Sequence, residues 1–392
     1  MTSDGLRQQY SLALDMTRLA DLHLAGRRAT GIDRVLQAYA VQYCERARAV
    51  LRWRGRHYVL DAAHSLQLLR WFAQGQCPKS LGWWLLLAVV RSWHARDITG
   101  YWLINAGHSG LENSGYASEM QRMQVLPVIV IQDLIPLTHP EYNREGEFAR
   151  HHQRIKTACS CARLLVCISA ATQQQLAQYA AKQGWFLPAT TVAHLGVPVA
   201  MPEYWRRDET DAYFVVISTV EARKNHLMLL QIWRDFIDQG VANPPRLICI
   251  GKKGWEAEQT FDLLERCQQL QGIVQHITDC EDKALMHWLT GARALLFPTF
   301  AEGFGLPVIE ALQHGVPVVL TDLPVFHEFA GTVPEYLPQL DHGAWRQTIL
   351  DYSQIDHPRR QAQLQRMAEF VAPQWGDHFD MLQRNLTTPS DV

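Results

Sequence analysis

The second half of the chain alternates short apolar runs, rich in β-branched residues, with longer segments of helical period. The apolar runs predict buried strands at Tyr213–Thr219, Arg246–Gly251, Ile273–Ile277, Ala294–Pro298 and Pro317–Thr321. Apolar residues spaced three and four apart predict helices between them, at Lys224–Asp238, Glu256–Leu270, Glu281–Thr290 and Pro307–His314. Strands joined in this order by helical crossovers form a parallel, doubly wound sheet, whose ligand crevice lies at the carboxyl ends of the strands.

The first half repeats this pattern less regularly. Strands are expected at Leu12–Met16, Ala49–Trp53, Gly100–Asn105, Val125–Gln132, Leu164–Ser169 and Thr190–Leu195, and helices at Ile32–Ala47, Arg144–Ala158 and Ala170–Lys182. The polar, proline-containing stretch Gly196–Asp211 separates the last strand of one half from the first strand of the other. We therefore expect two α/β domains, over residues 1–200 and 201–375, and a C-terminal helix over 376–392 that packs back toward the first domain.

Composition and net charge limit the kinds of binding partner that can be expected. The 392 residues, 47% of them apolar, suffice for two hydrophobic cores. The 37 basic and 39 acidic side chains give a formal net charge of −2, so no global field attracts a polyanion, and nucleic acid is not expected as a partner.

Cysteine usage and apolar runs bear on the compartment. The eight cysteines form neither a CxxC pair nor a zinc-type cluster, which is typical of reduced thiols in a cytoplasmic protein. The N-terminal residues lack the features of a signal peptide, and the longest apolar run, Leu81–Val90, is too short to span a bilayer. We expect a cytoplasmic protein, either free or at the inner face of the cytoplasmic membrane.

The segment from Ala294 to His314 has the layout of an anion-binding turn. A predicted strand leads into the loop Thr299–Leu306, and Pro307 stands where a first helical residue is expected, because its missing N–H has no intrahelical partner there. Gly303 and Gly305 lack a Cβ atom, so a ligand can approach the backbone closely. The free N–H groups and the helix dipole favour a phosphate at this place.

Two carboxylates frame this turn, Glu302 in the loop and Glu310 about one turn into the helix. A carboxylate can accept two hydrogen bonds from a vicinal diol such as that of a ribose. The spacing by itself leaves two interpretations open: a site for phosphate, ribose and sugar, or an ordinary strand–helix turn with solvated glutamates.

Several motifs follow one another in a recognisable order. They are Ser218–Asn225 (S-T-V-E-A-R-K-N), Phe297–Thr299 (F-P-T), Glu302–Glu310 (E-G-F-G-L-P-V-I-E) and His314–Val319 (H-G-V-P-V-V). Together they resemble the retaining GT-B glycosyltransferases of family 4, a group with an EX7E motif and many bacterial polysaccharide enzymes. The resemblance implies an α/β fold of the GT-B type, in which two Rossmann-like, doubly wound domains face a central cleft.

The resemblance also implies an activity. We expect a metal-independent retaining transferase that moves a hexose from a nucleotide diphosphate sugar, GDP-mannose or a UDP-sugar, to a glycan or lipid-linked acceptor in surface polysaccharide synthesis. No cofactor is expected besides this donor substrate. Such enzymes are thought to work by front-face attack, in which the leaving diphosphate accepts the acceptor's proton, and no second carboxylate is placed here for a double displacement. Catalysis would then rest on positioning and electrostatics.

The family pattern assigns roles in the second half. Glu310 is expected to bind the nucleotide ribose and Glu302 the hydroxyls of the transferred sugar, while the backbone amides of Gly303, Phe304, Gly305 and Leu306 face the sugar and the diphosphate. Arg223 and Lys224 are expected to stabilise the negative charge that grows on the leaving diphosphate. The alternative is a solvated basic helix start, although basic charge there opposes the helix dipole. Many relatives carry an arginine where this chain has Thr219, so Arg223 is expected to substitute for it.

Two segments of the first half resemble the family as well. Thr30–Val35 is similar to its T-G-I-x-R segment, in which Gly31 lets backbone approach the donor and Arg34 reaches the phosphates. A helix start capped by Thr30, with a solvated arginine, is the alternative. Gln132–Glu141 resembles a stretch that begins with histidine in relatives.

In relatives, that histidine contacts the donor sugar near the reacting carbon. Gln132 can hydrogen-bond a sugar hydroxyl but cannot hold a proton as an imidazole does. Asp133 is expected either to orient the acceptor hydroxyl or to serve as a turn or cap residue.

The run Leu81–Val90 contains Trp83 and Trp84 and is flanked by Lys79, Arg91 and Arg96. Two interpretations stand: a buried helix of the first domain, or an interfacial helix that makes peripheral contact with a membrane. The second would favour a lipid-linked acceptor.

Other functions remain in view. A nucleotide-sugar epimerase or a phosphorylase of the same fold would keep the nucleotide site, and a non-catalytic sugar- or nucleotide-binding protein would explain the departures at Gln132 and Thr219. An NAD-dependent oxidoreductase fits poorly, because no G-x-G-x-x-G follows the early strands.

Overall fold

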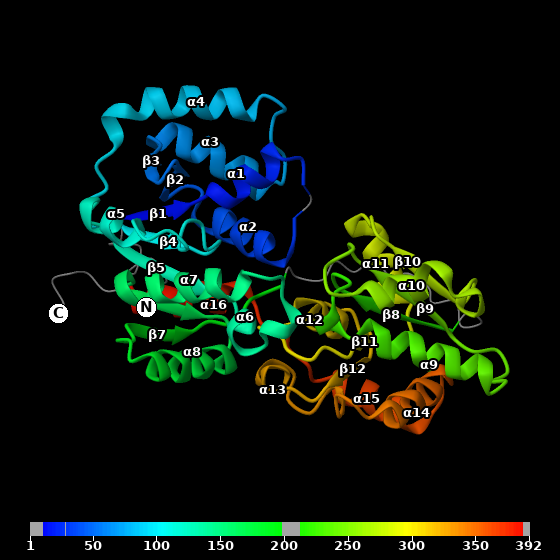
Figure 1. Ribbon diagram of the computed structural model, residues 1–392. Helices are drawn as coiled ribbons and strands as arrows, with labels where there is room; N and C mark the ends of the chain where they lie inside the picture. The colour runs from blue at the N-terminus through cyan, green and yellow to red at the C-terminus, as the bar shows by residue number, and fades with distance from the viewer. Residues whose placement is uncertain (1–10, 28, 198–211, 387–392) are drawn as a thin grey trace. The chain divides into compact units, whose positions relative to one another are not determined.

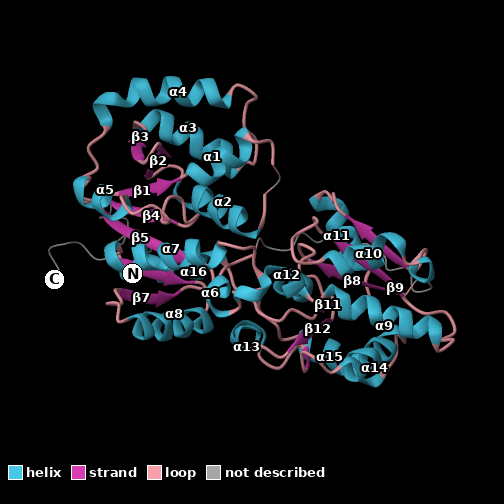
Figure 2. Ribbon diagram, viewed as in Figure 1, coloured by secondary structure: helices cyan, strands magenta, loops and turns pink. Residues whose placement is uncertain are grey.

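The computed structural model describes residues 11–27, 29–197 and 212–386. The chain divides into two compact units (Figure 1): one comprises Met1–Leu134, Phe148–Leu195 and Trp375–Val392, and the other Ile135–Glu147 and Gly196–Gln374. Most of the boundary stretch predicted at Gly196–Asp211, and residues 387–392 of the predicted last helix, lie outside the described residues. Figure 2 shows each unit as a sheet flanked by helices, so the predicted α/β class is confirmed.

The first unit contains a seven-stranded sheet in the order β3-β2-β1-β4-β5-β6-β7. Its strands are β1 (Leu12–Asp15), β2 (Ala47–Trp53), β3 (Arg56–Val59), β4 (Trp102–Asn105), β5 (Leu126–Ile131), β6 (Leu164–Cys167) and β7 (Ala189–Val192). All pairs are parallel except β2–β3. Arg54 and Gly55 form the turn of that hairpin, and both have positive φ (49° and 81°), which matches the twist of an antiparallel pair.

Eight helices of the first unit are described: α1 (Thr17–Leu24), α2 (Gly31–Tyr43), α3 (Ala62–Ala73), α4 (Leu81–Arg91), α5 (Tyr116–Arg122), α7 (Glu147–Cys161), α8 (Ala170–Gln183) and α16 (Trp375–Asn385). The last of these, α16, packs on α2, far away in sequence. The hydroxyl of Tyr39 lies 2.8 Å from Nε2 of His378, and the Phe379 ring meets Tyr39 and Tyr43 edge-on. Helix α16 therefore completes the core of the first unit.

The second unit contains a fully parallel six-stranded sheet in the order β10-β9-β8-β11-β12-β13. Its strands are β8 (Tyr213–Ile217), β9 (Arg246–Ile250), β10 (Val274–Ile277), β11 (Leu295–Phe297), β12 (Val318–Thr321) and β13 (Glu335–Leu337). Its helices are α6 (Ile135–Thr138), α9 (His226–Asp238), α10 (Glu258–Arg266), α11 (Asp282–Gly291), α12 (Leu306–Gln313), α13 (Pro324–Ala330), α14 (His342–Ser353) and α15 (Pro358–Met367). Trp233 and Trp345 are fully buried in its core.

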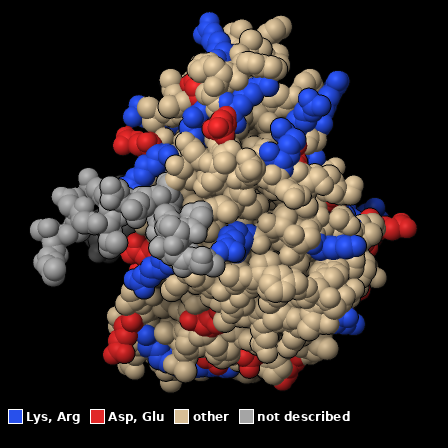
Figure 3. Space-filling view, turned by 90° about the vertical axis from the view of Figure 1, so that its left-hand side faces the viewer, with Lys and Arg blue, Asp and Glu red and all other residues tan. Residues whose placement is uncertain are grey.

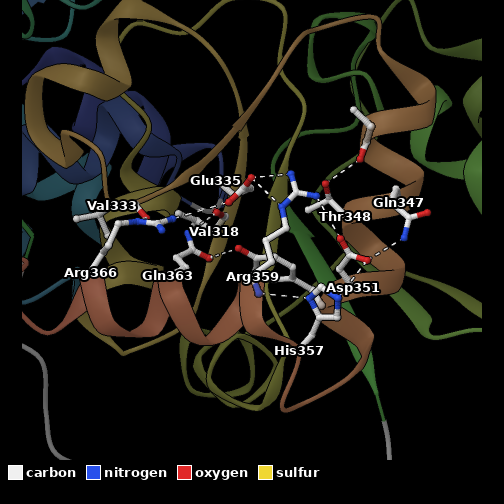
Figure 4. A network of polar contacts seen from close by, with 12 residues as sticks. Val318, Val333, Glu335, Gln347, Thr348, Asp351, His357, Arg359, Gln363 and Arg366 are labelled. Atoms are coloured by element: carbon white, nitrogen blue, oxygen red, sulfur yellow. Dashed lines mark hydrogen bonds and ion pairs between the residues drawn. The ribbon is translucent and has the colours of Figure 1, made fainter.

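Polar contacts fix α15 against the β12–β13 edge of this sheet (Figure 4). Arg359 donates to Oε1 of Glu335 through Nε (2.9 Å) and Nη2 (2.6 Å). The fully buried Gln363 donates to the carbonyl oxygen of Val318 (2.7 Å) and accepts from the hydroxyl of Tyr352 (2.9 Å). The amide of Gln363 thus connects β12, the strand next to the edge strand β13, with α14 and α15.

Several elements differ from those predicted. The helix expected at Ile32–Ala47 ends at Tyr43, because Ala47 already pairs with Leu12 in the sheet. The helix expected at Glu256–Leu270 is interrupted at Cys267, whose ψ of 104° is not helical, and only a 3-10 turn follows. The strands β3 and β13 and the helices α1, α3, α5, α6 and α13 to α15 were not predicted. In the part of the chain that the structure describes, no helix is both long enough and apolar enough to cross a bilayer.

Candidate active site

The turn between β8 and α9, Ser218–Asn225, is held by the loop that follows β9. Val220 N donates to the carbonyl oxygen of Lys252 (2.9 Å), and Gly254 N donates to that of Val220 (2.9 Å). Glycine is required at Gly251, because a Cβ atom there would overlap the carbonyl oxygen of Ser218. The loops at the carboxyl ends of two neighbouring strands therefore support each other and fix the backbone that carries Arg223 and Lys224.

The β11–α12 loop lies against the same turn, since β11 is the other neighbour of β8. Phe300 N donates to the carbonyl oxygen of Arg223 (2.8 Å), and Nη1 of Arg223 donates to that of Ala301 (2.5 Å). Nη1 also lies 3.3 Å from Oε2 of Glu302, and Nζ of Lys224 donates to the same oxygen. Two cations from one loop thus contact one carboxylate from the next.

Glu221 completes a charge cluster of four residues, Glu221, Arg223, Lys224 and Glu302. Nη2 of Arg223 donates to Oε1 of Glu221 (2.6 Å). Nζ of Lys224 also lies 4.9 Å from the centroid of the Phe297 ring. The cluster holds two positive and two negative groups, so each cation has a fixed position before any ligand binds.

Burial and the neighbouring opposite charges act in opposite directions on the pKa of Glu302, and likewise on the pKa of Lys224. Burial raises the pKa of Glu302, but the adjacent Lys224 ammonium and Arg223 guanidinium outweigh it and hold the pKa below its ordinary value. Burial and the Arg223 charge lower the pKa of Lys224, against the opposing influence of Glu302. Glu302 therefore remains a carboxylate at neutral pH.

The start of α12 is shaped by glycine. Gly305 precedes the helix with a φ of 105°, and a Cβ atom there would lie 2.8 Å from Cε1 of Phe326, so both the dihedral angle and the packing require glycine. The helix begins at Leu306, one residue earlier than predicted, and Pro307 stands in its first turn, where a missing N–H costs little. Phe304 is only 2% exposed and packs against Phe329, so it can offer a ligand its backbone but not its ring.

The structure thus brings together the predicted residues of the second unit. Arg223, Lys224 and Glu302 are in direct contact, Gly303 to Leu306 follow in the chain, and the half-buried Glu310 lies about one turn into α12.

The remaining predicted residues lie in the first unit. Gln132 and Asp133 directly follow β5. Nε2 of Gln132 donates to the carbonyl oxygen of Ala106 (3.3 Å). The carbonyl oxygen of Asp133 lies 3.2 Å from Nε2 of His151.

Gly31 and Arg34 lie in the first turn of α2. Thr30 caps the helix, as predicted, and its N and Oγ1 both donate to Oδ2 of Asp33 (2.8 and 2.6 Å). Among the described residues, no heavy atom other than those of its chain neighbours and of its own helix backbone lies within 4 Å of the position of a Cβ on Gly31, so packing does not require glycine there.

The support that Tyr142 gives to the β11–α12 loop could not be predicted from the sequence. Residues 135–147 belong to the second unit, where the ring of Tyr142 stacks on Phe300 (centroids 5.3 Å apart) and its carbonyl oxygen accepts a hydrogen bond from Nε1 of Trp255 (3.0 Å). Tyr142 thereby supports the loop that carries Glu302. Among the described residues, no group of three or more His, Cys, Asp or Glu is arranged to hold a metal ion.

Residues 201–332 match the family model described as glycosyl transferases group 1. The serotype-specific mannosyltransferase WbdA of Escherichia coli is 28% identical over 258 residues, which cover 59% of this chain and 30% of that protein. The O-antigen chain mannosyltransferase B of Escherichia coli is 26% identical over 260 residues, which cover 63% of this chain and 66% of that protein. The match to WbdA therefore spans less than a third of that protein's length.

Solved structures resemble the whole chain. The crystal structure of Anabaena Alr3699/HepE in complex with UDP and glucose aligns with a TM-score of 0.66 at 18% identity, covering 98% of this chain and 100% of that one. The chain has the GT-B glycosyltransferase fold. The sucrose-phosphate synthase of Thermosynechococcus elongatus also aligns, with a TM-score of 0.60 at 14% identity, over 96% of this chain and 98% of that one. The GT-B resemblance drawn from the sequence motifs is confirmed.

Proposed function

We propose that this GT-B chain is a hexosyltransferase, which moves a sugar from a nucleotide diphosphate sugar to a glycan or lipid-linked acceptor during synthesis of a bacterial surface polysaccharide. The observation that carries the proposal is the contact of Arg223 and Lys224 with Glu302, next to the glycine turn that opens α12. Fixed cations beside a helix start suit a leaving diphosphate, whose negative charge grows as the sugar bond breaks. The match to glycosyl transferases group 1 includes all of these residues.

Two donor classes compete. The curated relatives are named as mannosyltransferases, which favours GDP-mannose, whereas the Anabaena structure contains UDP and glucose, which favours a UDP-sugar. We place GDP-mannose first, because the identity to WbdA, 28%, exceeds the 18% to the Anabaena protein.

In the proposed reaction the second unit holds the donor. The backbone N–H groups of Gly303 to Leu306 and the positive end of α12 receive the diphosphate, and Glu310 accepts hydrogen bonds from the ribose hydroxyls. Glu302 accepts hydrogen bonds from hydroxyls of the transferred sugar. Arg223 and Lys224 then neutralise charge on the leaving diphosphate, so the reaction as proposed needs neither a metal ion nor a cofactor.

We propose that the configuration of the sugar is retained by front-face attack, with the leaving diphosphate taking the acceptor's proton. A double displacement would need a free carboxylate nucleophile, whereas Glu302 is held by two cations that reduce its nucleophilicity. The first unit would contribute positioning: Gln132 hydrogen-bonds the donor sugar, Asp133 orients the acceptor hydroxyl, and Gly31 and Arg34 approach the diphosphate.

The test is transfer by the purified chain from radiolabelled GDP-mannose and from a panel of UDP-sugars to oligosaccharide and lipid-linked acceptors. We expect one donor to give a product that keeps the donor's anomeric configuration. Glu310→Ala should weaken donor binding by about 10- to 100-fold, the loss expected for hydrogen bonds to a charged group. The control is Glu265→Ala, since Glu265 lies in the same unit but is half exposed and paired with Lys253.

A second function, binding without transfer, is favoured by Gln132 and Thr219, which stand where relatives carry histidine and arginine. Donor binding in a thermal-shift assay, with no product from any acceptor, would establish that function instead. Interconversion of the free nucleotide sugar would identify an epimerase, and dependence on inorganic phosphate a phosphorylase. A chain that neither binds nor turns over any nucleotide sugar would contradict all of these.

A further inference from the structure

The helix α4 presents an apolar stripe to solvent. Its members are exposed to 75%, 57%, 54%, 70% and 68%, in the order Trp83, Leu86, Leu87, Val90 and Trp93. Their spacing of three and four residues places them on one side of the helix and of the 3-10 turn that follows it. We call these five residues the α4 stripe.

The opposite side of α4 anchors the helix to the first unit. Leu81, Leu85 and Ala88 are buried, and the Trp84 ring meets that of Trp71 edge-on, with centroids 4.7 Å apart. The helix is therefore apolar on both sides, but only one side faces the core. The interpretation as a buried helix does not fit this division, because a buried helix would be covered on both sides, whereas an interfacial helix leaves one apolar side exposed. A contiguous apolar surface of this kind marks a place where something docks.

The charges around the stripe indicate what docks there. Lys79 precedes the helix, Arg91 ends it, Arg96 follows it, and no Asp or Glu occurs between Lys79 and Arg96. The guanidinium carbon of Arg96 lies 3.0 Å from the centroid of the Trp93 ring. In Figure 3, Lys and Arg side chains lie beside an uncharged surface at the top of the picture, where Figure 1 places α4.

A cavity of about 630 Å³ adjoins the C-terminal end of the stripe. The charged side chains that line it are three arginines and two carboxylates: Arg56, Arg96, Arg122, Asp97 and Glu119. Arg122 is paired with Glu119 (2.8 Å), so the remaining charges of this rim are two arginines and one aspartate. This end of the stripe is therefore basic as well.

We propose that the α4 stripe inserts into the interface of a membrane that contains anionic lipids. Tryptophans at both ends of an apolar stripe, with flanking Lys and Arg, are the combination that favours this depth of a bilayer. The helix has 11 residues and is about 16 Å long, so it lies along the surface and does not span the apolar core. The flanking cations reach phosphate headgroups while their aliphatic stems lie on apolar groups.

A second copy of the chain is the less favoured occupant. Pairing two identical stripes about a two-fold axis would bring two basic rims together, and the stripe provides no acidic residue to neutralise them. Membrane attachment goes beyond glycosyl transfer and does not depend on it. If the proposed transfer is also correct, attachment would bring the enzyme to a lipid-linked acceptor.

Co-sedimentation of the full chain with vesicles tests the proposal. We expect binding to vesicles of phosphatidylcholine with phosphatidylglycerol, weaker binding to phosphatidylcholine alone, and weaker binding at high salt. The double variant Trp83→Ser with Leu87→Ser should bind at least about tenfold more weakly, because two inserted side chains are lost. Replacing Lys79 and Arg91 by Gln should remove most of the preference for the anionic vesicles.

The control variant is Phe186→Ser with Val371→Ser, which removes two apolar side chains elsewhere that are more exposed (81% and 82%) than Trp83 and Leu87, and it should bind as the unchanged chain does. All substituted residues are exposed, so the melting temperature should stay the same in each variant. Absence of vesicle binding at low salt, equal binding by the stripe variant, or a dimer in light scattering that the stripe variant abolishes would each overturn the proposal. None of these results would alter transfer to an oligosaccharide in solution, so the two proposals fail separately.

Discussion

The surroundings of Lys224 act in opposite directions on the charge of its ammonium group. Burial and Arg223 disfavour its charge, and the contact with Glu302 favours it. A lysine in such a pair is costly to remove by itself, because the carboxylate that remains is buried with a poorer partner, the guanidinium of Arg223 at 3.3 Å.

Lys224→Met is therefore expected to have two separable effects. Loss of a cation that stabilises the leaving diphosphate should lower kcat/KM by about 10²- to 10³-fold. Because the buried carboxylate of Glu302 would keep only Arg223 as a cationic partner, the free energy of unfolding should also fall by about 1–3 kcal/mol. Transfer kinetics and urea unfolding measure the two effects.

The double variant Lys224→Met with Glu302→Gln separates a structural role from a functional one. A neutral amide needs no ammonium partner, so stability should return toward that of the unchanged chain while transfer stays low. The comparison for transfer is Glu302→Gln alone: if the double variant transferred as well as that single variant, Lys224 would act only by compensating the charge of Glu302.

At the scale of elements, much of the second sheet could be predicted, because β8, β9, β11 and β12 are almost entirely buried and read as continuous apolar runs. The strand β3, Arg56–Val59, carries Arg and His at the edge of a sheet, and β13 has only three residues, so neither gives such a run. Helices α14 and α15 are rich in polar residues, and their burial depends on contacts with β12 and β13 that no local pattern reveals.

The burial of α4 could not be predicted from the sequence either. Its residues are apolar all round, so helical period by itself could not tell which side would be covered. Similarly, the contact of Arg223 and Lys224 with Glu302 joins residues 78 or more positions apart. It depends on β8 lying between β9 and β11, an order that the succession of elements along the chain does not determine.

Gln363 gives a prediction for the C-terminal helices. Gln363→Leu would leave the carbonyl oxygen of Val318 and the hydroxyl of Tyr352 without their buried partner, so the free energy of unfolding should fall by about 2–4 kcal/mol. The matched control is Gln365→Leu in the same helix, because Gln365 is exposed and should tolerate the change within about 0.5 kcal/mol. Equal unfolding midpoints in urea for the two variants would contradict this account of α15.

For the whole molecule, the two units contain carboxylates whose pKa values shift in opposite directions. Burial raises the pKa of Asp15, in the first unit, from 3.8 to about 6, although Thr17 N donates to its Oδ1. In the second unit the pKa of Glu302 is lowered, because the attraction of two cations outweighs burial.

These shifts predict different pH responses. Between pH 3.8 and about 6 folded Asp15 keeps a proton that the unfolded chain has lost, so stability of the first unit should fall by about 3 kcal/mol as pH rises through this window. Glu302 contributes stability above the unfolded glutamate pKa of about 4.3, and this contribution disappears as pH falls through the lower folded value. Calorimetry of the unchanged chain, Asp15→Asn and Glu302→Gln across this range checks both signs. Asp15→Asn should flatten the loss between pH 4 and 6, and an unaltered slope would contradict the assignment to Asp15.

Because each unit is built from separate segments of the chain, neither unit can be completed by one continuous stretch during synthesis or in a truncated protein. The chain leaves the first unit after Leu134, returns at Phe148, leaves again after Leu195 and returns at Trp375. A ribosome must therefore release α16, which is made long after α2, before Tyr39 and Tyr43 meet the ring of Phe379. For the same reason no single cut yields two self-sufficient fragments: a piece that ends before residue 196 lacks α16, and a piece that begins there lacks Tyr142 under its glycine-rich loop. Whichever half is made alone would emerge with part of its interior missing.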